Sequence, residues 1–378
     1  MEMKMVLAGG GTGGHVYPAL SVAEELAGRF PGLDLLFIGT RSGLESRVIP
    51  ESGYRIRYVS SRGVRGKGPL GTMFTLATVS VGLFQALSIL MRFRPSLVFG
   101  SGGYASASVI LAASMLRCRI VLQEQNSIPG LTNRLLASRA ERIYLGFEAA
   151  REHLAGRRGV LVTGNPLRRS IVGEDTDDRR SEFGLAAGPP ALLVFGGSQG
   201  ARNLNRAVVD YLLRTDGVQA IIQTGNRDYR WVRERLEPCA GRVYISPYIS
   251  NIHHAYRAAD VALTRAGALS VSELAAVGLP AVLVPYPYAA DDHQTLNARH
   301  LVEAGGAVMI EDGRLSGETL GDVLDRLFAD GGRLEKMKSA LGAVARPDAA
   351  VRIADDIQAL CGWNRNSAPC EGGGGGDG

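Results

Sequence analysis

The segment Met-Val-Leu-Ala-Gly-Gly-Gly-Thr-Gly-Gly-His, residues 5–15, places a run of glycines directly after a short apolar stretch. The apolar stretch, Met3–Ala8, has the length and composition of a buried parallel strand. Tyr17–Phe30, which follows the glycines, has the apolar spacing of a helix, with Pro18 near its first turn. A strand, a glycine loop and a helix in this order indicate an α/β domain with a parallel sheet.

The same arrangement returns in the second half of the chain, where Ala191–Phe195 is a strand, Gly196–Gly200 a glycine loop and Ala201–Leu213 a helix. Similar apolar runs predict further strands at Leu33–Gly39, Ser96–Gly100, Arg119–Gln123, Arg142–Leu145, Val160–Thr163, Ala220–Gln223, Val243–Ile245, Val261–Leu263 and Ala281–Val284. The expected fold is therefore α/β, with two tandem Rossmann-like, doubly wound domains. We expect the ligand site in the cleft between them, beyond the carboxyl ends of the strands.

The length of 378 residues suits two domains of ordinary size. The stretch Gly173–Pro190 is first charged and then rich in glycine and proline, which is typical of a linker. We expect an N-terminal domain over residues 1–167, which a C-terminal helix at 349–362 rejoins, and a second domain over 168–348. The glycine-rich end of the chain, 363–378, is predicted to be disordered.

The composition, 46% hydrophobic and 21% charged, is that of a soluble globular protein. The formal net charge of +5 is too small to indicate nucleic acid, and it suits an acidic ligand or an anionic membrane surface. The four cysteines form no C-x-x-C pair, so neither a zinc site nor a disulfide framework is indicated. The first residues lack the apolar run of a signal peptide, and we expect a cytoplasmic location.

The first glycine loop satisfies the dinucleotide-binding pattern G-x-G-x-x-G at residues 9–14. A dinucleotide site also needs an acidic residue at the end of the second strand, but the only acid there, Asp34, lies at the start. A P-loop is excluded at Lys67 because the next residue is glycine rather than serine or threonine. The backbone N–H groups of a glycine loop can nevertheless converge on a phosphate.

Polar side chains follow several predicted strands. His15 can act as a base on a hydroxyl or donate to a sugar or phosphate, or it can merely hydrogen-bond its own loop. Glu273, early in the helix Leu269–Val277, can accept bonds from the two hydroxyls of a ribose, or it can form a capping box with Ser270. The acid and amide groups of residues 291–297 suit sugar hydroxyls, and nothing indicates a divalent metal.

The uncharged stretch Gly68–Met91 is long enough for a membrane span. Its polar residues share one helical face: Thr75, Thr78, Gly82, Gln85 and Ser88. Its apolar residues occupy the other: Met73, Leu76, Ala77, Leu83, Phe84, Leu87 and Leu90. This pattern favours an amphipathic helix over 69–91, which either covers the sheet or binds an anionic membrane. The second alternative is supported by the flanking basic residues Arg62, Arg65, Lys67, Arg92 and Arg94.

Eight motifs, spread in order over nearly the whole chain, carry a family resemblance. They are Gly-Gly-Thr-Gly-Gly-His (10–15), Gly-Gly-Tyr (102–104), Glu-Gln-Asn (124–126), Gly-Leu-Thr-Asn (130–133), Gly-Asn-Pro-Leu-Arg (164–168), Gly-Gly-Ser-Gln-Gly-Ala-Arg (196–202), Arg-x-Gly-Ala-Leu-Ser-Val-Ser-Glu (265–273) and His-Gln-x-x-Asn-Ala (293–298). With them the chain resembles glycosyltransferase family 28, in particular the members that build lipid II for peptidoglycan.

The resemblance implies a GT-B fold and a metal-independent, inverting transferase with no cofactor. It implies transfer of N-acetylglucosamine from UDP-N-acetylglucosamine to the 4-hydroxyl of lipid I, the undecaprenyl-diphospho-N-acetylmuramoyl-peptide. It also implies a peripheral protein on the cytoplasmic face of the bacterial plasma membrane, with other cell-wall synthesis proteins as further partners. Nucleic acid is not an expected partner.

The resemblance assigns roles to individual residues, with His15 as the candidate catalytic base. On the side of the first domain it implies substrate contacts by Thr12, Gly13, Gly14 and, to the donor sugar, Asn126. On the side of the second domain it implies contacts to the uracil, ribose, diphosphate or sugar by Arg168, Ser198, Ile249, Ala268, Leu269, Ser270, Val271, Ser272, Glu273 and Gln294.

Two positions depart from the family pattern. Gln123 stands where members often have histidine, so no role of that histidine applies here. His293 stands where members often have glutamine, which changes one of two donor-sugar contacts. Among other functions, an oxidoreductase is disfavoured by the missing ribose acid, and a non-catalytic sugar-nucleotide binder would leave His15 unused. A UDP-N-acetylglucosamine epimerase, which needs no lipid acceptor, remains the alternative.

Overall fold

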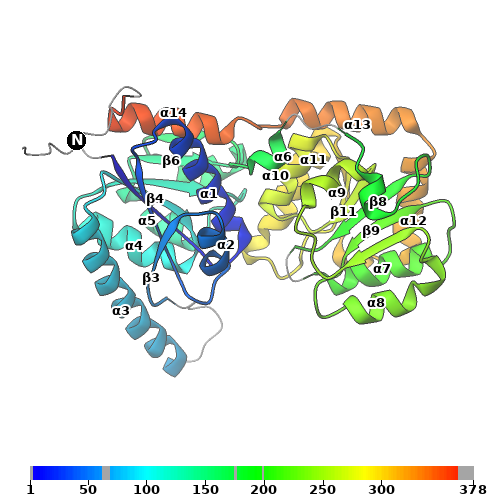
Figure 1. The fold of residues 1–378 in the computed structure, drawn as a ribbon, viewed down its shortest axis with the longest axis horizontal. Helices are drawn as coiled ribbons and strands as arrows, with labels where there is room; N and C mark the ends of the chain where they lie inside the picture. Colours follow the sequence, from blue (N-terminus) through cyan, green and yellow to red (C-terminus); the bar gives the residue numbers. More distant parts are fainter. Residues whose placement is uncertain (1–2, 62–68, 174–176, 198–199, 365–378) are drawn as a thin grey trace, which may run out of the picture.

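The computed structural model describes residues 3–61, 69–173, 177–197 and 200–364, without the side chains of 69–79. Two parallel sheets, each covered by helices, form two domains that lie side by side (Figure 1). The predictions made for Ser198, Arg62, Arg65, Lys67 and the last fourteen residues fall outside the described residues. Within the described part of the chain, no helix combines the length and the apolarity that crossing a bilayer requires.

The first sheet has the strand order β3-β2-β1-β4-β5-β6-β7. Its strands are β1 Lys4–Gly9, β2 Asp34–Gly39, β3 Arg55–Tyr58, β4 Leu97–Gly102, β5 Arg119–Glu124, β6 Arg142–Leu145 and β7 Val160–Val162. Its helices are α1 Gly13–Arg29, α2 Glu45–Glu51, α3 Pro69–Phe93, α4 Gly103–Met115 and α5 Leu131–Leu136. Met5 and Leu7 of β1 pack into one hydrophobic core, and Val6 and Ala8 pack into the core on the opposite face. Side chains alternate between faces along a strand, so a continuous apolar run makes a strand that is buried on both sides.

The second sheet has the order β10-β9-β8-β11-β12-β13 and is also parallel. Its strands are β8 Ala191–Phe195, β9 Gln219–Gln223, β10 Val243–Ser246, β11 Val261–Thr264, β12 Ala281–Leu283 and β13 Ala307–Met309. Its helices are α6 Arg169–Val172, α7 Arg202–Leu212, α8 Tyr229–Arg235, α9 Ile252–Ala258, α10 Ala268–Val277, α11 His293–Ala304, α12 Gly317–Phe328 and α13 Gly331–Val344. The tandem α/β architecture predicted from the sequence is confirmed.

The strand order places the glycine loops where a ligand can reach them. In each sheet the order reverses between two central strands, β1 and β4 in the first and β8 and β11 in the second. The loops that leave such a pair run to opposite sides, which opens a crevice at the carboxyl ends of the strands. The loop of residues 10–12 follows β1, and Gly102 and Gly103 join β4 to α4. Residues 196–197 follow β8, and the loop of residues 265–267 follows β11.

Several local predictions need correction. Helix α1 begins at Gly13, four residues before the predicted start, and Pro18 lies inside it. The helix can begin so early because glycines 13 and 14 impose no side-chain restriction on the turn that follows the strand. Strands β3 and β13 were not predicted, because β3 alternates arginine with apolar residues at a sheet edge and β13 has only three residues.

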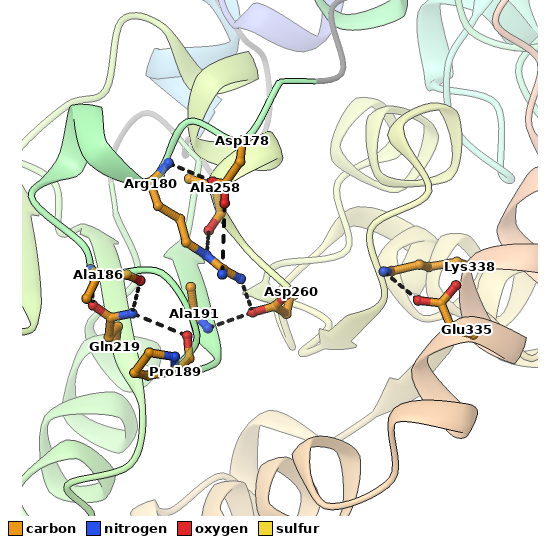
Figure 2. Close-up of polar contacts among 10 residues, drawn as sticks. All are labelled: Asp178, Arg180, Ala186, Pro189, Ala191, Gln219, Ala258, Asp260, Glu335 and Lys338. Carbon is orange, nitrogen blue, oxygen red and sulfur yellow. Dashed lines mark hydrogen bonds and ion pairs between the residues drawn. The ribbon is translucent and has the colours of Figure 1, made fainter.

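The polar stretch expected to be an interdomain linker packs on the second domain where it is described. Arg180 forms a 2.7 Å ion pair with Asp260, and Figure 2 shows the Arg180 side chain extending from the segment to the Asp260 carboxylate. The side-chain amide of Gln219 bonds both the N–H and the carbonyl of Ala186 and the carbonyl of Pro189. Arg180 and the chain around Ala186 and Pro189 therefore lie against the surface of the second domain.

The last helix, α14 (Ala349–Cys361), follows α13 of the second domain and packs on α1 of the first (Figure 1). Ile353, Ala354 and Ile357 of this helix lie in the core of the first domain. Trp363, predicted to begin a disordered tail, is instead 7% exposed, and its ring lies edge-on to Phe30 with centroids 5.7 Å apart. The prediction was wrong at this residue, because the indole finds an apolar pocket beside α1.

The described half of helix α3 differs from the predicted division into a polar and an apolar face. Gln85, expected on the polar face, accepts a 2.6 Å bond from the Ser60 N–H, and Gly82 lies buried against the same residue. Leu90 is buried in the core, whereas Phe84 is 71% exposed. Gly82 and Gln85 face the protein because the backbone of Ser60 passes close to this side of α3. Phe84, on the opposite side of the helix, therefore faces the solvent.

Candidate active site

His15 lies in the first turn of α1, with its ring against the loop that follows β4. Its Nδ1 atom is 2.8 Å from the Ser101 carbonyl oxygen and 3.2 Å from Gln125 Oε1. Gly102 and Gly103 both have positive φ, and a Cβ atom at Gly102 would lie 3.0 Å from the imidazole. The Gly-Gly-Tyr motif therefore makes room for the ring and adopts a backbone conformation that other residues rarely reach.

The loop that precedes His15 is held by a carboxylate that the sequence analysis missed. Glu45, 1% exposed, accepts bonds from the Gly11 N–H at 2.8 Å and from the Thr40 N–H at 2.7 Å. Gly10 packs against the same carboxylate, where any side chain would collide. Glu45 already accepts bonds from backbone N–H groups and from the Thr40 hydroxyl, so it is not the free ribose acid of a dinucleotide site.

Thr12, Gly13 and Gly14 stand at the N-terminus of α1, as the strand and glycine loop predict. Thr12 is the N-cap residue: its carbonyl accepts the N–H of His15 at 3.1 Å, and its hydroxyl makes no capping bond. The positive end of the helix dipole and the exposed hydroxyl are therefore both presented at this edge of the first domain.

Asn126 lies where a loop of the first domain meets α11 of the second. Buried Glu124 organises this loop by accepting bonds from the Asn126 and Gly130 N–H groups, each at 2.9 Å. Asn297 of α11 accepts the Ser127 N–H at 2.9 Å and lies 3.4 Å from Asn126 Oδ1. The loop therefore joins the carboxyl edges of the two sheets.

Arg168 and Glu273 form a largely buried ion pair, with Nη2 and Oε1 3.2 Å apart. The other carboxylate oxygen of Glu273 accepts a 2.7 Å bond from the Tyr256 hydroxyl. Burial and the adjacent carboxylate raise the pKa of Tyr256, so this phenol stays a donor. The Arg168 guanidinium lies 4.5 Å from the ring centre of Tyr17 in α1, and burial and the phenol of Tyr248 raise the pKa of Tyr17 to about 12.

Helix α10 begins at Ala268 with Gly267 as N-cap, so the capping box suggested for Ser270 and Glu273 is not formed. Both residues lie inside the helix, and the carboxylate points instead to Arg168 and Tyr256. The N–H groups of the first three helical residues have no partner within the helix. Together with the helix dipole, they form an anion-binding end.

Two further predicted contact residues of the second domain are Ile249, on the loop after β10, and Gln294, in the first turn of α11. The Ile249 N–H donates to Gln223 Oε1 at 2.9 Å, and the Tyr286 N–H donates to Gln294 Oε1, also at 2.9 Å. His293 Nδ1 lies 2.7 Å from the Ala290 carbonyl oxygen, which leaves Nε2 as the atom available to a ligand. The described residues contain no group of three or more histidine, cysteine or carboxylate side chains that could hold a metal ion.

Several hydrogen bonds and ion pairs between the domains join residues that lie beyond the carboxyl ends of the strands, as at Ser127–Asn297, Asn165–Ser272 and Arg134–Asp291. The carboxyl edges of the two sheets therefore face each other. Two doubly wound domains in this arrangement define the GT-B class of enzymes that use nucleotide sugars. The chain belongs to glycosyltransferase family 28, whose N-terminal domain matches residues 5–145 and whose C-terminal domain matches residues 191–353.

The relatives are similar over almost their whole length. The chain is 41% identical, over 94% of its length and 98% of the relative, to the UDP-N-acetylglucosamine--N-acetylmuramyl-(pentapeptide) pyrophosphoryl-undecaprenol N-acetylglucosamine transferase of Chlorobium limicola. A transferase of the same name from Anaeromyxobacter sp. is 42% identical over 93% of this chain and 92% of the relative. The crystal structure of Acinetobacter baumannii MurG is similar with a TM-score of 0.73 and 28% identity, covering 94% of this chain and 99% of that one.

A UDP-N-acetylglucosamine 2-epimerase described as putative, from Listeria monocytogenes, has a TM-score of 0.71 at 16% identity, covering 97% of this chain and 98% of that one. At 16% sequence identity, this similarity shows that the two proteins share a fold, and it says nothing about a shared function.

Proposed function

We propose that the chain transfers N-acetylglucosamine from UDP-N-acetylglucosamine to the 4-hydroxyl of the muramyl sugar of a pyrophosphoryl-undecaprenol-linked acceptor, with inversion at the anomeric carbon. This is the reaction for which its relatives are named. The proposal rests on one observation: the carboxyl edges of the two sheets meet, and candidate residues from both domains are connected at that place. There His15, at the N-terminus of α1, is connected through buried side chains to Ser272 in the first turns of α10.

The donor is proposed to bind on the second domain. The N-terminal turn of α10, Ala268–Ser270, suits the diphosphate, since its N–H groups are free of helical partners. Buried Arg168 Nε has no hydrogen-bond partner among the described residues and is a further donor for this anion. Glu273 suits the ribose hydroxyls, Ile249 the uracil, and Asn126 and Gln294 the transferred sugar.

The acceptor is proposed to enter on the side of Thr12, Gly13 and Gly14, with its diphosphate near this helix end. The Nδ1 atom of His15 is turned to Ser101, so Nε2 is the ring atom left to take the proton of the attacking hydroxyl. Charge develops on the departing UDP diphosphate, where the dipole of α10 and the Arg168 guanidinium stabilise it. Closure of the domains around both substrates would exclude water.

The chain is further proposed to dock on the cytoplasmic face of the plasma membrane through α3, where it could also meet other cell-wall synthesis proteins. Val81, Phe84 and Met91 are exposed at helical spacings of three and seven residues, which aligns them in one stripe. Arg92 and Arg94 follow at the end of the helix and suit anionic headgroups. An apolar stripe beside basic residues is typical of an interfacial helix.

The proposal is tested by supplying UDP-N-acetylglucosamine labelled in its sugar, with and without the lipid-linked muramyl acceptor. Label should move to the organic phase only when the acceptor is present. Label that stays in water in both reactions would refute the transferase, and conversion of the donor to its 2-epimer without acceptor would support the epimerase instead.

A further inference from the structure

Five side chains form a continuous hydrogen-bonded chain from the first domain to the second. His15 Nδ1 lies 3.2 Å from Gln125 Oε1, and Gln125 Nε2 donates to Gln123 Oε1. Gln123 Nε2 donates to Asn165 Oδ1 at 3.0 Å, and Asn165 Nδ2 donates to Ser272 Oγ at 3.0 Å. The three amides are buried, whereas His15 and Ser272 at the two ends are only half-buried.

Backbone carbonyls fix the direction of this chain at both ends, because a carbonyl oxygen can only accept. The Ser101 carbonyl lies 2.8 Å from His15 Nδ1 and 2.7 Å from Gln125 Nε2, so both of these atoms must carry hydrogen. The Gln125 carbonyl lies 3.0 Å from Asn165 Nδ2, so this amide cannot be reversed either. Gln123, between two amides of fixed orientation, has one arrangement that satisfies both neighbours.

The direction of the chain has a consequence at each end. On the acceptor side, hydrogen on Nδ1 leaves the Nε2 atom of a neutral His15 with its lone pair, as a base requires. On the donor side, Ser272 uses its oxygen as an acceptor from Asn165, so its own hydrogen is left to donate to a ligand. The same chain of hydrogen bonds therefore leaves His15 Nε2 as a proton acceptor at one end and the Ser272 hydroxyl as a hydrogen-bond donor at the other.

We propose that Gln125, Gln123 and Asn165 are positioning residues that hold neutral His15 in the Nδ1–H tautomer and turn the Ser272 hydroxyl toward the donor. The inference rests on the proposed function, in which His15 is the base. Amides suit this task because each both accepts and donates. A carboxylate at position 125 could accept from His15 but would face the Ser101 carbonyl and Gln123 Oε1 without hydrogen to donate.

The tautomer can be measured directly in the unaltered, full-length protein. Imidazole ¹⁵N shifts of protein labelled at its six histidines distinguish a protonated from an unprotonated ring nitrogen, and His15→Gln assigns the His15 signals. We expect Nδ1 protonated and Nε2 unprotonated at a pH where His15 is neutral. The reverse tautomer would overturn the inference even if the protein is an active transferase, so the two proposals fail separately.

Substitutions then test whether the amides cause the tautomer. Gln125→Met keeps the length of the side chain but removes its bond to His15 and the bond by which Gln125 Nε2 holds the Ser101 carbonyl in place. The variant should therefore give a mixture of tautomers and lower kcat at least tenfold, with the donor KM within about twofold. Gln123→Met, one step further from His15, should have the same effect to a smaller degree, and it replaces the first variant if that one fails to fold.

The matched control is Gln219→Met, a buried glutamine that bonds Ala186 and Pro189 (Figure 2). It lies at the amino end of β9, opposite the carboxyl edge that carries the site. It should leave both the tautomer and kcat unchanged. If the folded Gln125 or Gln123 variant keeps the single tautomer and the normal kcat, or if Gln219→Met shifts the tautomer equally, the amides do not position His15.

Discussion

Arg168 and Glu273 are each other's ion-pair partners at the junction of the domains, with 3.2 Å between Nη2 and Oε1. Burial alone would lower the pKa of Arg168, but the carboxylate outweighs it and the pKa is raised. The ion pair therefore fixes both side chains in place. Glu273 is proposed to bind the ribose of the donor, and Arg168 its diphosphate.

Glu273→Gln should weaken donor binding, because hydrogen bonds of ribose hydroxyls to a charged acceptor contribute about 1.5–3 kcal/mol. We expect the KM for UDP-N-acetylglucosamine to rise roughly tenfold or more, in steady-state assays at saturating acceptor. The variant should also lose about 3 kcal/mol of unfolding free energy, since it leaves Arg168 buried without its counter-charge. The control is Glu335→Gln, which breaks the exposed ion pair with Lys338 (Figure 2). It should leave the donor KM unchanged and alter the free energy of unfolding by no more than about 1 kcal/mol. A folded Glu273→Gln protein with normal donor KM would exclude the ribose role.

His15→Ala should lower kcat by roughly 10²- to 10⁴-fold, the range that general-base catalysis contributes. UDP binding, measured by calorimetry, should stay near normal because the nucleotide contacts are proposed on the second domain. His153→Ala removes an exposed histidine of the first domain and should have no effect on either measurement. Turnover close to normal in the His15 variant would show that another group takes the proton.

Phe84→Asp should reduce cosedimentation with vesicles that contain phosphatidylglycerol. A buried phenylalanine contributes about 1.5–3 kcal/mol, and the added charge is repelled by the anionic surface, so binding should fall roughly tenfold or more. Activity on a water-soluble, short-chain acceptor should be retained. Val351→Asp on α14 places the same charge at another exposed apolar position and should bind vesicles normally. If both variants bind equally well, α3 is not the docking surface.

Trp363→Ala should destabilise the protein by about 3 kcal/mol, as expected for loss of a buried indole from a core. Trp363→Phe keeps part of the contact with Phe30 and should cost less. Thermal and urea denaturation of the two variants measure the difference. Unchanged stability in the alanine variant would mean that the residue after α14 adds nothing to the first domain.

The fold could be predicted because its central strands are buried on both faces and are followed by glycine loops, as around Met3–Ala8 and Ala191–Phe195. These signals are local in the sequence. The end of helix α14 was predicted to within one residue, but the burial of Trp363 after it could not be, since that burial depends on Phe30, more than three hundred residues away. The faces of α3 were misjudged for the same reason, because the neighbour of Gln85 is Ser60.

The candidate site was predictable at the level of motifs and not at the level of contacts. Glycine loops and the resemblance predicted roles for His15, Arg168 and Glu273, and these roles stay predictions. The loops and the resemblance gave no indication that Glu45 holds the first loop, or that the side chains of Gln125, Gln123 and Asn165 are linked behind His15. Most of those contacts join residues from helices, loops and a strand that lie far apart in the sequence, and only the packed fold brings them together. Gly102 and Gly103 did give a signal, since two adjacent glycines after a strand indicate a close approach.

The stereochemistry of the product tests the central claim most directly. A single displacement by the acceptor hydroxyl, with a base on one side and the diphosphate leaving on the other, inverts the donor's α-linkage. The product of UDP-N-acetylglucosamine and the lipid-linked muramyl acceptor should therefore carry N-acetylglucosamine in β-linkage at the 4-hydroxyl, as shown by the NMR coupling of the anomeric proton. An α-linked product, or label recovered only as free sugar or nucleotide sugar, would contradict the proposed reaction.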